Sequence, residues 1–205
     1  MKLLADSDIS HKRVLVRVDF NVSLNPNYSI ADDTRIRQAL PTIEYLLKRK
    51  NHVILVTHLG RPPKREEKFS LKNVAKDLQK YLPHHKVRLI DDFLSPEYRE
   101  GIDQQDNEVL LLENIRFYPG EESNDPSLAQ KLAVLADIYV NDAFSVDHRA
   151  AASVVAITHF LPSYCGLLLS REITMLDAAI KHPKKPVVAI LGGSKISTKL
   201  RLIDT

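Results

Sequence analysis

The stretch KRVLVRVDFN, residues 12–21, decides the fold of this 205-residue chain. Its apolar run at 14–18 is rich in β-branched residues and has the length of a strand, and Asp19 and Asn21 follow directly at its end. This pattern is typical of a buried strand that delivers two polar side chains to a site. Asp and Asn also favour turns, so on this pair alone a turn and a site are both open.

Three further apolar runs end in the same way. In open α/β sheets, ligands bind in the crevice outside the carboxyl ends of the strands. The polar residues that follow the runs are therefore predicted to meet at one place. The runs and the residues that follow them are 52–57 with His58 and Arg61, 109–112 with Glu113, Asn114 and Arg116, and 138–140 with Asn141, Asp142, His148 and Arg149.

Helical patterns alternate with these runs and predict an α/β fold. Asp32, Asp33 and Thr34 favour the start of the first helix, Pro41 should kink it, and Ser70 should cap the second. We expect a three-layer, Rossmann-like arrangement, in which a parallel sheet with right-handed crossovers is flanked by helices. The predicted helices span 34–50, 71–82, 96–101, 127–135 and 168–180, and a further short strand spans 86–90.

Composition restricts the classes of protein to which the chain can belong. The formal net charge of +3 is small against 29 basic and 26 acidic side chains, and no run of like charge resembles a nucleic-acid-binding arm. The single cysteine, Cys165, excludes an intrachain disulfide framework and is compatible with a reducing compartment. No stretch approaches the roughly 18 apolar residues of a membrane span, and the N-terminus lacks the apolar core of a secretory signal. We expect a soluble, cytoplasmic protein without a nucleic-acid or membrane partner.

Four arginines and one histidine give the predicted site a positive charge. Guanidinium groups bind phosphate and carboxylate through pairs of hydrogen bonds, so such a pocket suits a small phosphorylated acid. Asp19 and Asn21 would then bind hydroxyl groups or orient an arginine. Any one arginine can instead be an ordinary surface charge, and Arg35, in the first turn of the first predicted helix, is open to both interpretations. The basic residues are Arg35, Arg61, Arg116, Arg149 and His58.

A weaker phosphate-binding signal lies near residue 192. Gly192 and Gly193, between an apolar run and a predicted helix, would expose backbone N–H groups to an anion, and Lys195 and Lys199 would share one face of that helix. The spacing does not match G-x-x-x-x-G-K-[ST], and no G-x-G-x-x-G occurs, so neither a Walker site nor a dinucleotide-binding fold is supported. Phosphate binding and plain surface charge are both open here.

Two other classes of protein fit part of the pattern. Asp19, Asn21 and Ser23 resemble the D-x-D-x-[TV] nucleophile loop of haloacid-dehalogenase-type phosphatases, but Asn21 stands where that chemistry needs an acid. A non-catalytic anion-binding domain also fits, because the sequence shows no catalytic triad and no metal-ligand spacing.

Five segments resemble the amino-terminal half of the phosphoglycerate kinases, in the same order and spacing along the whole chain. Five motifs in order are a highly specific signal. The resemblance implies the fold of the N-terminal domain of these kinases, and reversible phosphoryl transfer between 1,3-bisphosphoglycerate and ADP, which gives 3-phosphoglycerate and ATP in glycolysis. The segments are RVDFN at 17–21, HLGRP at 58–62, LLENIRFYPGEE at 111–122, NDAFSVDHRA at 141–150 and LGGSKISTKL at 191–200.

The same resemblance implies a division of the chain. Residues 1–167 would form the phosphoglycerate-binding domain, 168–186 a hinge helix and linker, and 187–205 the first strand and helix of a nucleotide-binding domain. A complete member of the family is longer, and its other half is expected to carry the adenine site and the ligand for the Mg²⁺ that accompanies ADP or ATP. The present chain is therefore expected to bind substrate and to turn over poorly. The family is usually monomeric, but an unpaired strand at 187–191 could drive self-association.

Roles for individual residues also follow from the resemblance. Arg35 would hold the carboxyl end of the substrate and stabilise the phosphoryl group in transfer. Lys199 would contact a nucleotide phosphate, beside Lys195 and the two glycines. The attacking carboxylate is already ionised at neutral pH, so positioning and charge stabilisation would do most of the catalytic work without a general base. The substrate-binding residues would be Asp19, Asn21, Arg35, His58, Arg61, Arg116 and Arg149, and the nucleotide-binding residues Gly192, Gly193, Lys195 and Lys199.

Three positions depart from the pattern of the family. Ser23 stands where the family usually has proline, Ala151 where it often has a second histidine, and Pro63 with Lys64 where an Asp-Gly turn is common. None of these removes a predicted phosphate ligand, so we expect them to affect loop geometry and local basicity.

Overall fold

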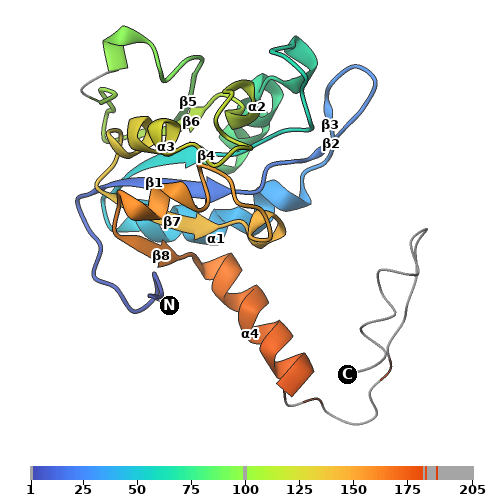
Figure 1. Ribbon diagram of the computed structural model, residues 1–205, viewed down its shortest axis with the longest axis vertical. Helices are drawn as coiled ribbons and strands as arrows, with labels where there is room; N and C mark the ends of the chain where they lie inside the picture. The colour runs from blue at the N-terminus through green and yellow to red at the C-terminus, as the bar shows by residue number, and fades with distance from the viewer. Residues whose placement is uncertain (1, 99–100, 182, 184–187, 189–205) are drawn as a thin grey trace. The chain divides into compact units, whose positions relative to one another are not determined.

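The core of the fold is a six-stranded parallel sheet in the computed structural model, which describes residues 2–98, 101–181, 183 and 188 (Figure 1). Each strand is parallel to its neighbours. The predicted α/β class with a parallel sheet is thereby confirmed. In order across the sheet, the strands are β5 (Lys86–Ile90), β6 (Glu108–Leu112), β4 (His52–Val56), β1 (Arg13–Val18), β7 (Ile138–Asp142) and β8 (Ser163–Cys165).

Strand β1 lies inside the sheet and is apolar on both faces. Val14 pairs with Val53 of β4 on one side and with Ile138 of β7 on the other. Burial on both faces explains why the sequence reads as a continuous apolar run, since neither face of a sheet covered by helices meets water.

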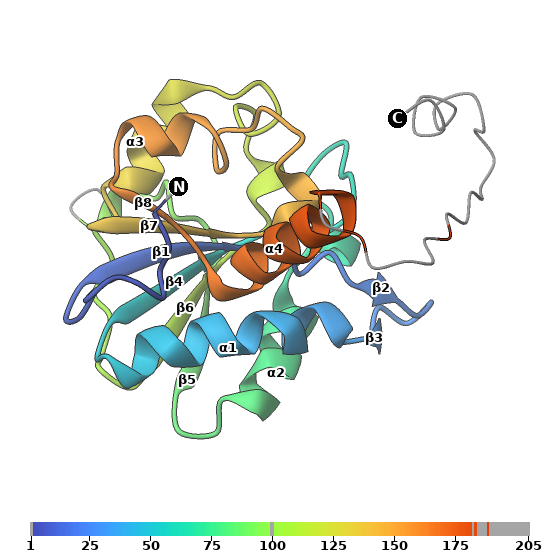
Figure 2. The ribbon, with the colours of Figure 1, turned by 90° about the horizontal axis from the view of Figure 1, so that it is seen from below.

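Helices cover both faces of the sheet and make the predicted three layers (Figure 2). Helices α1 (Thr34–Lys48) and α2 (Lys72–Tyr81) pack on the face that carries Val14 and Val16 of β1. Helix α3 (Pro126–Ala133) and the 3-10 turn Ala156–His159 pack on the face that carries Leu15. The other elements are α4 (Leu167–Lys181) and the 3-10 turns Glu67–Phe69, Pro96–Tyr98, Ile115–Phe117 and Phe144–Val146.

Some details of the helices differ from their predictions. Ser70 shares the start of α2 with Glu113: its hydroxyl accepts the backbone N–H of Lys72 at 3.4 Å and donates to Glu113 at 2.6 Å, and the backbone N–H of Leu71 donates to the same carboxylate at 2.8 Å. Helix α1 continues through Pro41. Of the helix predicted for 96–101, the described residues show a 3-10 turn at Pro96–Tyr98, and residues 99–100 lie outside the described part.

Three short strands were not predicted. Strands β2 (Ser23–Leu24) and β3 (Ile30–Asp32) form an antiparallel hairpin, with residues 25–29 between them. Strand β8 is only three residues long and lies at one edge of the sheet. Its edge is partly covered, since the N–H of Leu4 donates to the carbonyl of Cys165 at 2.9 Å.

The contacts within the chain separate a unit that ends at Glu172 from a second unit that begins at Ile173. The domain boundaries predicted at 167 and 186 stay a prediction. The strand and helix predicted after residue 187 lie outside the described residues. Within the described ranges, no helix is long and apolar enough to cross a membrane.

Candidate functional site

The carboxyl ends of β1, β4 and β7 meet where the order of the strands reverses. From β1 the chain first builds the sheet on the β4 side, and it returns later to place β7 on the opposite side of β1. Such a reversal leaves a crevice beyond the strand ends, which is the usual ligand position in open parallel sheets. Asp19 follows β1, His58 lies two residues beyond β4, and Asp142 ends β7.

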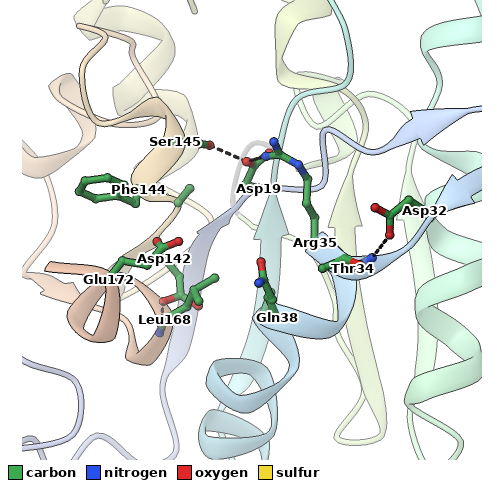
Figure 3. A pocket seen from close by; sticks show the side chains of 12 residues that line it. Asp19, Asp32, Thr34, Arg35, Gln38, Asp142, Phe144, Ser145, Leu168 and Glu172 are labelled. Carbon is green, nitrogen blue, oxygen red and sulfur yellow. Dashed lines mark hydrogen bonds and ion pairs between the residues drawn. The ribbon is translucent and has the colours of Figure 1, made fainter. Parts of the chain in front are cut away.

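One cavity beyond these strand ends is built around Asp19 and has a volume of about 310 Å³ (Figure 3). Arg35, from the first turn of α1, forms an ion pair with the Oδ2 atom of Asp19, and the hydroxyl of Ser145 donates to the same oxygen. Asp142 and Glu172 also line this cavity, which we call the Asp19 cavity. Its only described cationic side chain, Arg35, is therefore engaged by a carboxylate of the protein.

A second cavity of about 170 Å³ is lined by three arginines, and we call it the arginine cavity. Arg116 and Arg149, both predicted, are joined here by Arg17, which was not. Ser145 and Val146, adjacent in the chain, line one cavity each, so the two cavities are neighbours. The arginine cavity suits the phosphate end of a small anion because guanidinium groups match phosphate geometry.

Burial and like charge both act on Arg116. Burial lowers the pKa of Arg116, and the neighbouring positive charges of Arg149, Arg17 and Arg61 lower it further, against the attraction of Glu122. Its Nη1 donates to the carbonyl of Gly60, and its Nε lies 3.3 Å from a carboxylate oxygen of Glu122. An anion placed among these arginines would relieve their mutual repulsion.

Arg17 lies at the carboxyl end of β1 with only 2% of its surface exposed. Burial lowers the pKa of Arg17, and the charge of Glu121 acts in the opposite direction. Its Nε donates to the hydroxyl of Ser153 at 2.9 Å, and its Nη1 donates to the carbonyl of Val18 at 2.6 Å. A buried arginine that reaches a cavity is a strong sign of an anion site, but its position inside an apolar run concealed it in the sequence.

His58 lies against Arg17, with 3.2 Å between its Nδ1 atom and the arginine Nη2. Burial lowers the pKa of His58 to about 2, and the charges of Arg17, Arg116 and Arg149 add to this effect. The ring is therefore neutral at physiological pH. His58 therefore adds no positive charge to that of the neighbouring arginines.

Substitution of His58 by Gln is expected to change how stability depends on pH. In the unfolded chain His58 binds a proton below its usual pKa of about 6.5, whereas the folded chain does not until about pH 2, so acid favours unfolding. Between about pH 6.5 and about pH 5, the original chain should lose roughly 2 kcal/mol of unfolding free energy more than His58→Gln. Asp142 acts oppositely, because burial raises its pKa to about 6, but it is present in both proteins and cancels. Urea unfolding at several pH values measures the difference, and parallel curves would contradict the neutral assignment.

The loop that follows β4 is tied to the ends of β1 and β6. Asn21 Oδ1 accepts the N–H of Gly60 at 2.8 Å, so Asn21 holds the loop in addition to any role toward a ligand. Gly60 has φ +63°, and a Cβ atom there would lie 2.6 Å from the ring of Phe69. Arg61 follows as an exposed residue near Arg116.

Several polar residues at the strand ends serve the framework. Asn114 is fully buried: its side chain accepts the N–H groups of Leu59 and Arg116 at 3.2 Å and donates to the carbonyls of Leu59 and Phe69 at 2.8 and 3.0 Å. Asp142 Oδ1 accepts the N–H groups of Leu168 and Leu169 at 2.9 and 3.1 Å and thereby caps α4. Asn114 and Asp142 thus hold the backbone segments that surround the site.

The predicted site residues thus fall into three groups by their position in the structure. Asp19 with Arg35, and Arg116 with Arg149, line the two neighbouring cavities. Asn21, His58 and Arg61 lie beside them without being among the lining residues. Gly192, Gly193, Lys195 and Lys199 lie outside the described residues.

The described residues offer no metal site. Within residues 2–98 and 101–181, no group of three or more His, Cys, Asp or Glu side chains is arranged to hold a metal ion.

Comparison with known proteins gives one consistent family. The family model described as phosphoglycerate kinase matches residues 4–205. The phosphoglycerate kinase of Desulforudis audaxviator is 50% identical over 99% of this chain, and the cytosolic phosphoglycerate kinase of Nicotiana tabacum is 47% identical over 98% of it. The solved structure of the phosphoglycerate kinase of Coxiella burnetii superposes with a TM-score of 0.86 at 40% identity and covers 98% of this chain. The chain spans about half the length of these relatives: 52%, 51% and 50%, respectively.

Proposed function

The chain belongs to the phosphoglycerate kinase family, and from this membership we propose that it binds 3-phosphoglycerate or 1,3-bisphosphoglycerate for phosphoryl transfer to and from a nucleotide. The observation that carries the proposal is the arginine cavity, where Arg17, Arg116 and Arg149 converge. Each charged hydrogen bond contributes roughly 1.5–3 kcal/mol, so a phosphate bound by two or three arginines would be held firmly.

The neighbouring Asp19 cavity would receive the other end of the substrate. Arg35 would bind the carboxylate or acyl phosphate, which requires that the ligand compete with Asp19 for the guanidinium. Asp19, once separated from Arg35, could accept a hydrogen bond from the substrate hydroxyl. A ligand that spans the two cavities would thus place its phosphate in the arginine cavity and its carboxyl end in the Asp19 cavity.

Chemistry at this site would depend on placement and charge. The 3-phosphoglycerate carboxylate is an ionised nucleophile at neutral pH, so its attack needs no general base. His58, neutral and buried, is suited to donate a hydrogen bond and not to remove a proton. Arg35 would balance the charge of the phosphoryl group in transfer, and correct placement of both reactants would supply most of the rate.

The nucleotide side of the reaction lies largely beyond this chain. ADP or ATP would bind as the Mg²⁺ complex, with Lys199, Lys195, Gly192 and Gly193 contributing phosphate contacts and the rest coming from the segment that relatives have in addition. The proposed organisation is a phosphoglycerate-binding domain at 1–167, a hinge at 168–186 and the start of a nucleotide-binding domain at 187–205. We place the protein in the cytoplasm as a monomer, with self-association through 187–191 as the alternative.

Calorimetric titration of the 205-residue chain tests the proposal. We expect 3-phosphoglycerate to bind at micromolar to sub-millimolar strength, Mg-ATP to bind hardly at all, and turnover to be close to background. Activity that returns when the other half of a relative is added would favour the kinase over a stand-alone anion-binding domain. A folded sample that releases no heat with 3-phosphoglycerate would contradict substrate binding by this chain.

A further inference from the structure

Four buried side chains form a continuous hydrogen-bonded row at the arginine cavity, which two of them, Arg17 and Glu121, line. The row runs from Glu121 through Ser153 and Arg17 to His58, and each member is 5% exposed or less. The Ser153 hydroxyl donates to Glu121 Oε1 at 2.6 Å, Arg17 Nε lies 2.9 Å from that hydroxyl, and Arg17 Nη2 lies 3.2 Å from His58 Nδ1. Substrate binding by His58 and the arginines does not by itself require Glu121 or Ser153.

The direction of every hydrogen bond in the row is determined by chemistry. A guanidinium group has donors and no acceptor, so Arg17 must donate both to the Ser153 oxygen and to His58 Nδ1. The Ser153 oxygen therefore accepts from Arg17, and its one proton goes to Glu121. Glu121 also accepts the backbone N–H of Ser153 at 2.9 Å, which fixes the carboxylate.

The consequence for His58 is a single tautomer. Because Nδ1 accepts a hydrogen bond, the one proton of the neutral ring lies on Nε2. No described residue makes a hydrogen bond with Nε2, so its N–H group has no partner within the described part of the chain. A neutral donor can bind a phosphate or hydroxyl oxygen without adding to the repulsion among the surrounding arginines.

We propose that Glu121 and Ser153 are positioning residues, which hold Arg17 so that His58 is kept as a neutral Nε2–H donor toward the substrate. Ser153 is itself held in place, since its carbonyl accepts the hydroxyl of Tyr139 at 2.7 Å. Glu121 is linked to Arg17 through the Ser153 hydroxyl and, like Arg17, lines the arginine cavity. The role toward substrate rests on the proposed function, whereas the tautomer of His58 is a property of the chain alone.

Nitrogen NMR of the ¹⁵N-labelled 205-residue chain tests the proposal without any ligand. Long-range ¹H–¹⁵N correlations, with His58 assigned through its loss in His58→Gln, should show an unprotonated Nδ1 and a protonated Nε2 from about pH 5 to about pH 8. A protonated Nδ1, or a ring that gains charge within this range, would overturn the proposal. The tautomer is read from the original chain, and His58→Gln serves only to assign its signals.

Substitutions then show whether Ser153 and Glu121 are needed for the Nε2–H tautomer of His58, or whether the direct contact of Arg17 with His58 is sufficient. Ser153→Ala should leave His58 as a mixture of tautomers, and Ser153→Thr, which restores a hydroxyl, should recover the Nε2–H form. Ser123→Ala, at an exposed serine two residues from Glu121, is the matched control and should change nothing. If Ser153→Ala does not fold, Glu121→Gln is measured instead, because an amide cannot accept through both of its groups. Full retention of the Nε2–H form in the folded variant would overturn the positioning role.

A binding titration shows whether the row affects the ligand. Ser153→Ala should weaken 3-phosphoglycerate binding about tenfold, in step with the loss of the Nε2–H form. If the original chain binds no 3-phosphoglycerate, the proposed function is wrong. The tautomer of His58 is measured without ligand, so that result is judged independently. Unchanged affinity together with a lost tautomer would overturn the role of the row in binding.

Discussion

Replacement of Arg149 by Ala is expected to weaken binding of 3-phosphoglycerate to this chain by roughly 100-fold, or about 3 kcal/mol. Arg149 lines the arginine cavity, and its only described side-chain hydrogen bond is a 3.3 Å contact from Nε to the neighbouring His148. Its remaining donors are thus free for a phosphate, and two charged hydrogen bonds are lost with the side chain. Calorimetric titration measures the change.

The fold should tolerate this substitution, because Arg149 is half-buried and supports no other element. Arg171→Ala is the matched control, since Arg171 is exposed and lines neither of the two cavities. Arg149→Lys should recover part of the affinity, because lysine retains the charge without the paired donors. Equal affinities for Arg149→Ala and Arg171→Ala would place the phosphate elsewhere.

The substitution Asn114→Ala is expected to lower the free energy of unfolding by about 4 kcal/mol. The side chain makes four hydrogen bonds from a fully buried position, and alanine would leave the buried groups of Leu59, Arg116 and Phe69 without partners. Each unpaired buried group costs roughly 1–3 kcal/mol, of which relaxation recovers a part. Urea unfolding monitored by circular dichroism measures the loss.

A half-buried asparagine provides the comparison for Asn114. Asn73 makes one solvent-exposed hydrogen bond, to the carbonyl of Tyr28 at 2.7 Å, so Asn73→Ala should cost less than about 1 kcal/mol. Because Asn114 joins the loop after β4 to the turn that carries Arg116, the variant should also bind anions more weakly at temperatures where it is still folded. A cost for Asn114→Ala similar to that of Asn73→Ala would show that water replaces the lost hydrogen bonds.

The parallel sheet was predictable because its strands are long and apolar on both faces. Apart from Arg17 and His52, residues 14–18, 52–56, 109–112 and 138–140 are apolar, and each segment lies in a strand of the structure. Strand β8 was not predictable in this way. Its three residues, Ser163–Cys165, are too few to show a period, and they form a strand because β7 offers a free edge.

The candidate site was only partly predictable from the sequence. Strand ends identified Asp19, Arg116 and Arg149, because polar residues that follow buried strands reach the ligand edge of the sheet. The same rule could not distinguish Asn114, which the fold uses as a framework residue, since both roles need a polar residue at that point. Arg17 was missed because its role depends on Ser153, more than 130 residues away, and not on local pattern.

The position of β1 in the sheet has a consequence for how the protein is made. One side of β1 pairs with β4, which follows soon after, but the other pairs with β7, which begins at Ile138. At about 5–20 residues per second, a ribosome needs roughly 6–24 s to extend the chain from the end of β1 to that point. Throughout this interval an apolar strand has an open edge, so β1 is a segment of the nascent chain that a chaperone would protect, and substitutions that slow the arrival of β7 should appear first as insoluble protein in cells.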